Sequence, residues 1–192
     1  MKLENIAVIK SSGQVKSVDS SQEGFEGFYL VGGNNVTDLG TLTGIENQQP
    51  QYVSLKDIEN KKLLVGDVIL LSKGTQIRAA LITEEDARKN LIASSTFINI
   101  RLKPGTLYPE VLVSYLNSSV GQANLNQLIQ GTVLKNIPIK NLRDLEISLN
   151  EDIDQKLIAQ LFHQNIKVLN DLDNLIDQQK NTFDTVITKF IK

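Results

Sequence analysis

An apolar residue at every seventh position near the C-terminus constrains this chain more than any other sequence feature. The repeat consists of Phe162, Leu169, Ile176, Phe183 and Phe190. The segment 151–192 contains no proline or glycine, so nothing in it interrupts a helix. A seven-residue apolar repeat on a helix forms a stripe that packs against another helix. The spacing therefore predicts one long helix with a helical partner.

The apolar stripe is broader than two positions per heptad. It also includes Ile158, Leu161, Ile166, Val168, Leu172, Leu175, Val186 and Ile187. A helix of about 39 residues is about 58 Å long at roughly 1.5 Å per residue, which is longer than a small domain is wide. Part of the helix must therefore project from the domain and needs a partner. The predicted dimerisation surface consists of Ile158, Phe162, Leu169, Leu172, Ile176, Phe183, Val186 and Phe190.

Length and composition allow one folded domain beside this helix. The chain has 192 residues, of which 41% are apolar, and this is enough for a core. The absence of cysteine excludes disulfides and thiolate metal sites and is typical of a reducing cytoplasm. The N-terminus lacks the features of a signal sequence, and no apolar run approaches the roughly 18 residues of a membrane span. We therefore expect a cytoplasmic protein that does not contact a membrane.

The net charge of −2 bears on nucleic-acid binding. Domains that bind nucleic acid by bulk electrostatic attraction are usually basic, so this mode of binding is not expected. The net charge does not exclude a local basic face, because such a face depends on how the charged residues are arranged in space.

Short apolar segments separated by turn residues predict a sheet in the first half of the chain. Each segment is four to seven residues long and rich in Val, Ile, Leu and aromatic residues. The predicted strands are 6–9, 27–31, 51–54, 68–72, 78–82 and 96–102. Their pattern favours a curled or barrel-like sheet over alternating β and α units. The segment 32–50 is rich in Gly, Asn and Thr and predicts a long loop, which in a compact domain is often functional.

Helices are predicted after the sheet. Pro109 suits a helix start, and apolar residues at helical spacing follow it up to Gly121. A second helical stretch covers 123–129. Residues 137–149 alternate apolar and polar side chains, and this pattern predicts two strands or extended segments that close the domain.

The long helix has its own polar start in residues 150–152, where acidic side chains interact favourably with the helix dipole. The predicted fold class is α+β. It comprises a domain with a curled, barrel-like sheet and short helices over residues 1–150, followed by a long coiled-coil-type helix over 151–192.

Catalytic chemistry has little support in the sequence. The single His163 lies on the long helix and is expected to be an ordinary surface or stripe residue. The acidic run 84–86 follows Thr83, and this order indicates a helix start rather than a metal site. No glycine-rich phosphate-binding pattern is present. We therefore predict no catalytic residue, no metal and no cofactor.

Two segments are candidates for contact with a ligand. Residues 66–78 form a turn, a buried strand, a polar turn and a second strand, and they present Lys73, Thr75, Gln76 and Arg78 at one hairpin end. Arg and Gln make paired hydrogen bonds to base edges, whereas Lys mostly supplies charge to phosphates. Residues 130–136 form a small polar loop before an apolar strand. Both patterns are equally compatible with plain solvated connections.

Taken in order, these pieces resemble the specificity subunit of type I restriction-modification enzymes over nearly the whole chain. The matching pieces are GDVILLSKG at 66–74, LYP at 107–109, YLNS at 115–118, GTVLKNI at 131–137, LEISL at 145–149 and QKLIA at 155–159. The resemblance implies a target-recognition domain with a curled β core that contacts one half of a split DNA site. It also implies that the long helix is the spacer that sets the distance to the other half and docks methyltransferase subunits.

A complete subunit of that family holds two recognition domains and two antiparallel helices, whereas this chain has one of each. We expect a second copy of the chain to supply the other half, because two-fold pairing of identical surfaces is the commonest solution. Two domains held apart by this helix can straddle more than one turn of DNA, roughly 34 to 36 Å. The expected partners are double-stranded DNA, a second copy of the chain, methyltransferase subunits and, in a complete system, restriction subunits.

The leading hypothesis is a non-enzymatic DNA-recognition subunit whose partners carry out the chemistry. The expected DNA contacts are Asn34, Asn35, Thr37, Lys73, Gln76, Arg78, Thr132 and Lys135. A second hypothesis is a decoy or assembly regulator that binds methyltransferase subunits through its helix without recognising DNA, and the acidic charge balance leaves it open. An independent hydrolase or nuclease is least favoured, because the sequence offers no convergent acid, base or metal set.

Overall fold

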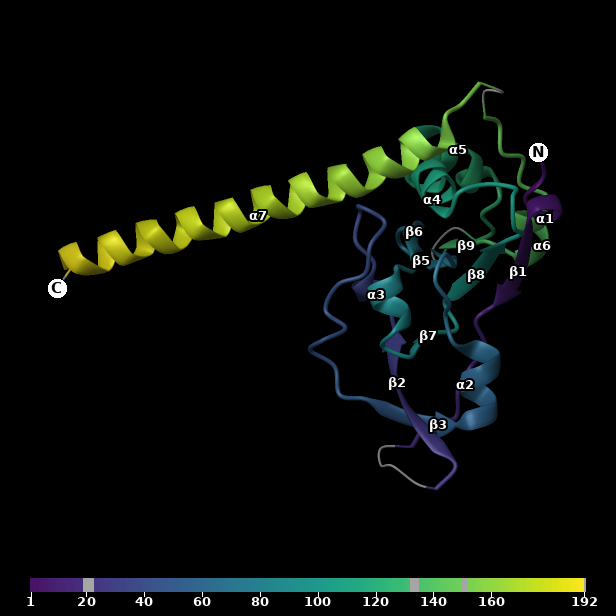
Figure 1. The fold of residues 1–192 in the computed structure, drawn as a ribbon, viewed down its shortest axis with the longest axis horizontal. Coiled ribbons are helices and arrows are strands. Elements are labelled where there is room, and N and C mark those ends of the chain that lie inside the picture. Colours follow the sequence, from purple (N-terminus) through teal and green to yellow (C-terminus); the bar gives the residue numbers. More distant parts are fainter. Residues whose placement is uncertain (19–22, 132–134, 150–151, 192) are drawn as a thin grey trace.

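A mixed α and β domain and one long helix that leaves it make up this protein (Figure 1). The computed structural model describes residues 1–18, 23–131, 135–149 and 152–191. The strands are β1 (Ala7–Ser11), β2 (Phe25–Val31), β3 (Gln51–Ser54), β4 (Val68–Leu71), β5 (Lys73–Gly74), β6 (Arg78–Leu81), β7 (Leu91–Ala93), β8 (Phe97–Leu102) and β9 (Lys135–Asn136). The helices are α1 (Leu3–Ile6), a 3₁₀ turn η1 (Gly33–Asn35), α2 (Leu55–Lys61), α3 (Glu84–Ala87), α4 (Pro109–Asn117), α5 (Ser119–Gln127), α6 (Ile139–Arg143) and α7 (Gln155–Ile191).

The central sheet has four antiparallel strands in the order β1-β8-β4-β6. Side chains alternate between its two faces, as they must in a pleated strand. Ile9, Leu70 and Ile100 point to one face and pack with Leu112 and Leu116 of α4 in the main core. This packing holds α4 across the sheet. The C-terminal end of α4 lies beside the start of β6.

A second layer covers part of the opposite face. In this layer β2 pairs antiparallel with β3 and parallel with β7. Its Val31 and Leu91 belong to a second core cluster with Ile69, Ala80 and Phe97 of the central sheet. Strand β4 is therefore buried on both faces, which accounts for its unbroken apolar sequence. The β1 edge of this face is different, because Lys10 and Arg101 there are exposed.

The predicted α+β class with a long C-terminal helix is confirmed, and all six predicted strands are present within two residues of the predicted bounds. The described strands form open sheets rather than a closed barrel. The first helix ends at Asn117 instead of continuing to Gly121, because Ser118 caps a new helix through a hydrogen bond from Gly121 N to its Oγ (3.1 Å).

The prediction of two strands or extended segments over 137–149 is wrong in part. Residues Ile139–Arg143 form α6, which begins directly after Pro138 and buries Leu142 in the main core. Proline is well tolerated just before a helix, because no hydrogen bond within the helix requires its backbone N–H. Helix α7 also begins later than predicted, at Gln155, where Asp154 Oδ1 accepts a hydrogen bond from Leu157 N (3.0 Å). Residues 150 and 151 of the predicted start lie outside the described residues.

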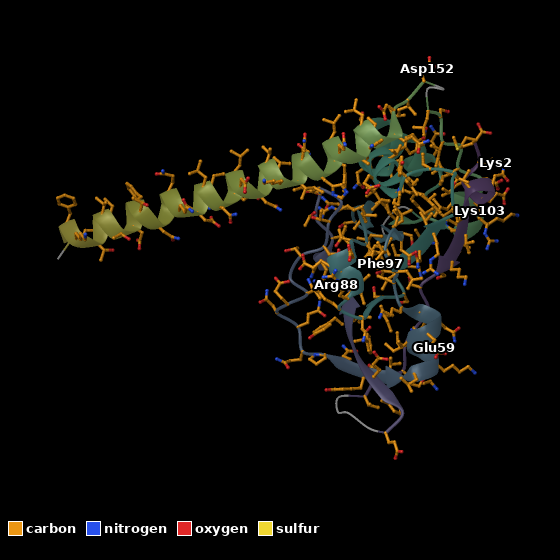
Figure 2. The ribbon with its side chains drawn as sticks, in the orientation of Figure 1. Lys2, Glu59, Arg88, Phe97, Lys103 and Asp152 are labelled. Carbon is orange, nitrogen blue, oxygen red and sulfur yellow. The ribbon has the colours of Figure 1, made fainter. Side chains whose placement is uncertain are left out.

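Only the first part of α7 packs against the domain. Ile158 and Phe162 contact the main core beside α4, and His163 Nε2 lies 3.0 Å from Glu110 Oε1. Beyond Leu169 every described residue of α7 is exposed, and Figure 2 shows these side chains standing clear of the domain. None of the described helices is both long and apolar enough to cross a bilayer.

Candidate nucleic-acid interface

A polar groove lies at the β6 edge of the central sheet. It encloses about 340 Å³ between the start of β6, helices α4 and α5, and β9. Its lining residues are Asp38, Thr75, Gln76, Ile77, Arg78, Asn117, Gln122, Asn126 and Lys135. Two cations, one carboxylate and four amides therefore face one concave surface. Guanidinium and amide groups are the side chains best suited to paired hydrogen bonds with base edges.

Arg78 connects this groove to the long loop 32–50. Its Nε lies 2.8 Å from Asp38 Oδ1, and its Nη1 donates to Val36 O (3.2 Å). Its Nη2 also donates to Gln76 Oε1. The guanidinium is thus held in one orientation at the mouth of the groove. Asp38 is largely exposed, so its ion pair with Arg78 is accessible to a competing anion or base edge.

Asn117 anchors the wall of the groove to the edge strand. Its Oδ1 accepts from Ala79 N and its Nδ2 donates to Ala79 O, both at 2.9 Å. The side chain therefore satisfies both backbone groups that follow Arg78. The loop joins the same edge, because Leu81 N donates to Gly40 O (2.9 Å). Gly40 has φ +77°, and a Cβ there would lie 2.9 Å from Val113, so a side chain is excluded.

The loop 32–50 is organised by its own polar side chains. Asn35 Oδ1 accepts from Gly32 N (2.9 Å) and from Gln48 Nε2 (3.2 Å), while its Nδ2 donates to Thr43 O (2.9 Å). Thr37 Oγ1 accepts from Thr41 N (3.2 Å) and pairs with Thr41 Oγ1 (2.8 Å). These contacts use most of the hydrogen-bonding capacity of Asn35 and Thr37 inside the loop.

The structure brings together some of the predicted DNA contacts. Gln76, Arg78 and Lys135 line the polar groove. Lys73 is paired with Asn136 across β5 and β9 and does not line the groove. Asn34 is exposed on η1, next to Asn35. Thr132 lies outside the described residues. Whether any of these residues contacts DNA stays a prediction.

Four polar residues that line the groove were not predicted from the sequence. Asp38 lies in the loop 32–50 and forms an ion pair with Arg78. The two residues are forty positions apart in the sequence, so no local pattern contains both. Asn117 follows the apolar residues of α4 and was noted in the sequence only as part of the YLNS piece at 115–118. Gln122 and Asn126 are four positions apart on α5, and this spacing places two amides on one helix face. That periodicity was a usable signal.

The residues weighed for catalysis have ordinary surroundings. Thr83 caps α3 by accepting from Asp86 N (3.2 Å), and Glu84 and Glu85 make surface ion pairs with Arg88 and Lys89. This confirms the predicted helix start. Within the described ranges no three His, Asp or Glu side chains gather closely enough to hold a metal ion.

The predicted dimerisation residues fall into two groups along α7. Ile158 and Phe162 pack against the main core of their own domain, and Leu169 is half-buried. The others stand in solvent: they are Leu172, Ile176, Phe183, Val186 and Phe190. Phe183 is 69% exposed and Phe190 is 82% exposed, values that are far above those of core aromatics.

The fold of this chain, a sheet domain with one long helix leaving it, is similar to part of the S subunits of type I restriction-modification systems. The S subunit from M. genitalium matches 92% of this chain with a TM-score of 0.57 and 18% sequence identity. The HsdS subunit from Thermoanaerobacter tengcongensis matches 95% with a TM-score of 0.56 and 18% identity. A chain from a study of complex assembly and conformational transition of the type I system matches 95% with a TM-score of 0.60 and 16% identity.

The chain spans only 41% to 45% of the length of these three structures. Its sequence matches no protein-family model and no curated protein. The structural matches nevertheless cover 92% to 95% of this chain, and they confirm at the level of the fold the resemblance first found in short sequence pieces.

Proposed function

We propose that this chain is a non-enzymatic DNA sequence-recognition subunit of a type I restriction-modification system. In this proposal residues 1–150 contact one half of a split inverted site, and the helix over 151–192 pairs with that of a second copy. The pair positions methyltransferase and restriction subunits, which carry out the chemistry. The observation that supports it most is an apolar stripe exposed beyond Leu169 on the long helix of a chain whose fold matches an S subunit over 92% of its own length.

The exposed stripe supports self-pairing on physical grounds. Burial of apolar surface is favourable by roughly 25 cal/mol per Å², so aromatic and aliphatic side chains left in water on one helix face favour association. An antiparallel pair of α7 helices buries this stripe and places one domain at each end. Two copies then present two polar grooves to one duplex.

Oligomeric state is the direct test of this pairing. Because Ile158 and Phe162 belong to the domain core, the truncated control should stop after Leu169 rather than before the helix. We expect light scattering to show a dimer for the full chain and a folded monomer for the truncated chain. A monomeric full chain would remove self-pairing from the proposal.

The polar groove supports the DNA part of the proposal, and Arg78 gives its sharpest test. Arg78→Ala should weaken binding to a duplex selected from a random pool by about 1 to 3 kcal/mol and relax selectivity at one position. Asp38→Asn should strengthen binding, because it releases the guanidinium from its ion pair. Fluorescence anisotropy measures both affinities.

The matched control is Arg88→Ala, which removes an exposed arginine paired with Glu84 outside the groove. This variant should bind as the unaltered chain does. Equal affinities for the Arg78→Ala variant and the unaltered chain would exclude Arg78 from base contact.

One observation favours the second hypothesis, an assembly regulator without DNA recognition. The guanidinium of Arg78, the best candidate for base contact, is already occupied by Asp38, Gln76 and the backbone of Val36. A complex that retains methyltransferase subunits through α7 but selects no sequence from a random duplex pool would support the regulator. Enrichment of a split inverted site would instead support the recognition subunit.

A further inference from the structure

A second cavity lies at the opposite edge of the central sheet from the polar groove. It encloses about 230 Å³ between β1, β8 and the end of α2. Its lining residues are Val8, Lys10, Asn60, Lys62, Asn99 and Arg101. Strands β1 and β6 are the two edges of a four-stranded sheet, and three strand spacings of roughly 4.8 Å place their axes about 14 Å apart.

The sheet register places the cationic side chains of this cavity on one face. Lys10 pairs with Asn99 and Val8 with Arg101, so Lys10 and Arg101 are diagonal neighbours on adjacent strands. Lys62 follows the last turn of α2 and closes the cavity from above the sheet. A smaller neighbouring hollow shares Lys10, Asn60 and Asn99 and adds Lys61.

Arg101 is held in place by a buried carboxylate. Its Nε and Nη2 donate to the two oxygens of Asp67 at 2.6 and 2.7 Å, and Asp67 is fully buried. The hydrogen bond to Asp67 raises the pKa of Arg101, followed by the attraction between their charges. Two of its five N–H donors are used by Asp67, the other three have no partner among the described residues, and the Arg101 side chain is 44% exposed. Asp67 thus orients Arg101 without blocking it.

Apart from Asp67, no described carboxylate forms a direct ion pair with a cation of the cavity. Lys62 Nζ donates to Asn90 Oδ1, and the Nδ2 of the same amide donates to Glu26 Oε1 (2.6 Å). Lys10 forms no ion pair with any described carboxylate. Three cations and the single carboxylate of Asp67 leave a net charge of +2 around a cavity of about 230 Å³. Like charges in one cavity repel each other, and an anion that enters it removes this repulsion.

We propose that this cavity binds a phosphate group, and that a backbone phosphate of nucleic acid is its occupant. The outer edge of a fixed arginine and two flexible ammonium groups together match a tetrahedral oxyanion. The source of the phosphate rests on the proposed function. The amide nitrogens of the cavity are already engaged, because Asn99 Nδ2 donates to Asp67 Oδ2 (3.0 Å) and Asn60 Nδ2 to Lys56 O (2.8 Å), whereas Asn99 Oδ1 is buried without a partner among the described residues. The contact is therefore one of charge and not of sequence.

The test combines the double variant Lys10→Met/Lys62→Met with salt-dependent binding to a random-sequence duplex. The slope of log affinity against log salt concentration should fall in magnitude by about 0.9, the value for one lost phosphate contact. Binding to the random duplex and to a selected duplex should weaken by the same factor. Lys140→Met, which removes an exposed lysine outside the cavity, should change neither quantity. An unchanged slope in the double variant overturns the proposal and leaves the proposed function standing.

A second arm separates the phosphate site from DNA recognition. Inorganic phosphate titrated into the full chain should shift the side-chain amide signals of Asn60 and Asn99 in NMR spectra, and the double variant should abolish these shifts. A chain that shows the shifts but binds no duplex keeps the phosphate site and loses the proposed function. No shifts and no change in slope exclude the site.

Two further measurements test the folding of the double variant and the choice of phosphate over carboxylate as the occupant. The double variant relieves repulsion but loses the hydrogen bond from Lys62 Nζ to Asn90 Oδ1, so urea denaturation of both chains is measured and binding is compared where both are folded. Poly-glutamate is the alternative occupant, with carboxylates in place of phosphates. Competition by poly-glutamate equal to that by inorganic phosphate, with the same dependence on Lys10 and Lys62, would overturn the choice of phosphate in favour of an acidic protein.

Discussion

At the scale of single residues, Asn117 joins α4 to the edge of the central sheet. Its amide exchanges two 2.9 Å hydrogen bonds with the backbone of Ala79. Asn117→Ala leaves the N–H and C=O of a buried residue without their partner, which should lower the free energy of unfolding by about 1 to 3 kcal/mol. Urea denaturation of the chain stopped after Leu169 measures this change without interference from dimerisation.

The matched control is Asn126→Ala, because Asn126 lines the same groove but is exposed on α5. It should alter the unfolding free energy by less than about 0.5 kcal/mol, as is usual for surface substitutions. Equal stabilities of the two variants would show that Asn117 does not hold the edge strand.

The ion pair between Lys2 and Asp144 ties the N-terminus to the segment after α6. The hydrogen bond from Lys2 Nζ (2.8 Å), followed by the charge of Lys2, lowers the pKa of Asp144 below its ordinary 3.8. The same contact raises the pKa of Lys2 above 10.5. Stability from the lowered acid is present above the unfolded pKa and disappears as pH falls through the folded pKa. Stability from the raised base is present below 10.5 and disappears as pH rises through the folded value.

Asp144→Asn should therefore lower the urea midpoint by a constant small amount across the neutral range. The difference from the unaltered chain should shrink in acid below pH 3.8 and in strong base above pH 10.5. Both side chains are about half exposed, so solvent screening keeps the effect small. A difference that persists unchanged in acid would assign the effect to something other than this ion pair.

Local chemistry explains which site residues could be predicted. Gln76 and Arg78 stand at one end of a strand that alternation and turn residues define, so their shared location was visible in the sequence. Composition also predicted that Asn35 and Thr37 lie in a polar loop. It could not predict that both side chains accept hydrogen bonds from backbone N–H groups of the same loop. The ion pairs of Asp38 with Arg78 and of Asp67 with Arg101 could not be predicted, because each joins segments that are distant in the sequence.

At the scale of elements, two phenylalanines on α7 occupy equivalent heptad positions in different environments. Phe162 packs against the main core, whereas Phe183 is 69% exposed. Phe162→Ala should lower the unfolding free energy of the chain stopped after Leu169 by about 1 to 3 kcal/mol. Phe183→Ala should weaken dimerisation of the full chain and leave the unfolding of its monomer unchanged. Sedimentation velocity and urea denaturation separate the two effects, and a Phe162→Ala variant as stable as its parent would contradict this division of the helix.

Elements were predictable where a local signal defined them. Thr83, Pro109 and the heptad repeat each mark a helix through residues within one or two turns, and all three helices are present. Helix α6 was missed because its five residues are too few to show a helical period, and it forms because Leu142 reaches the core. The parallel pairing of β2 with β7 joins segments about sixty residues apart, so no window of sequence contains it.

At the scale of the whole molecule, α7 leaves the domain as one uninterrupted helix (Figure 1). In the proposed dimer, the length of this helix would set the distance between the two domains. In an antiparallel pair the midpoint lies near Asp173, within the exposed part of the helix. A change of length at this point therefore moves both domains without altering the packing of Ile158 and Phe162 on the core.

Repeating residues 170–176 once at this midpoint should widen the gap between the recognised half-sites. Seven residues add about 10.5 Å to each helix, which corresponds to about three base pairs at roughly 3.4 Å each. One full heptad keeps the apolar stripe in register, so dimerisation should be preserved. A four-residue insertion at the same point shifts the stripe around the helix and should weaken the dimer. Selection from a random duplex pool measures the gap, and half-sites with an unchanged spacing in the seven-residue variant would show that α7 does not set this distance.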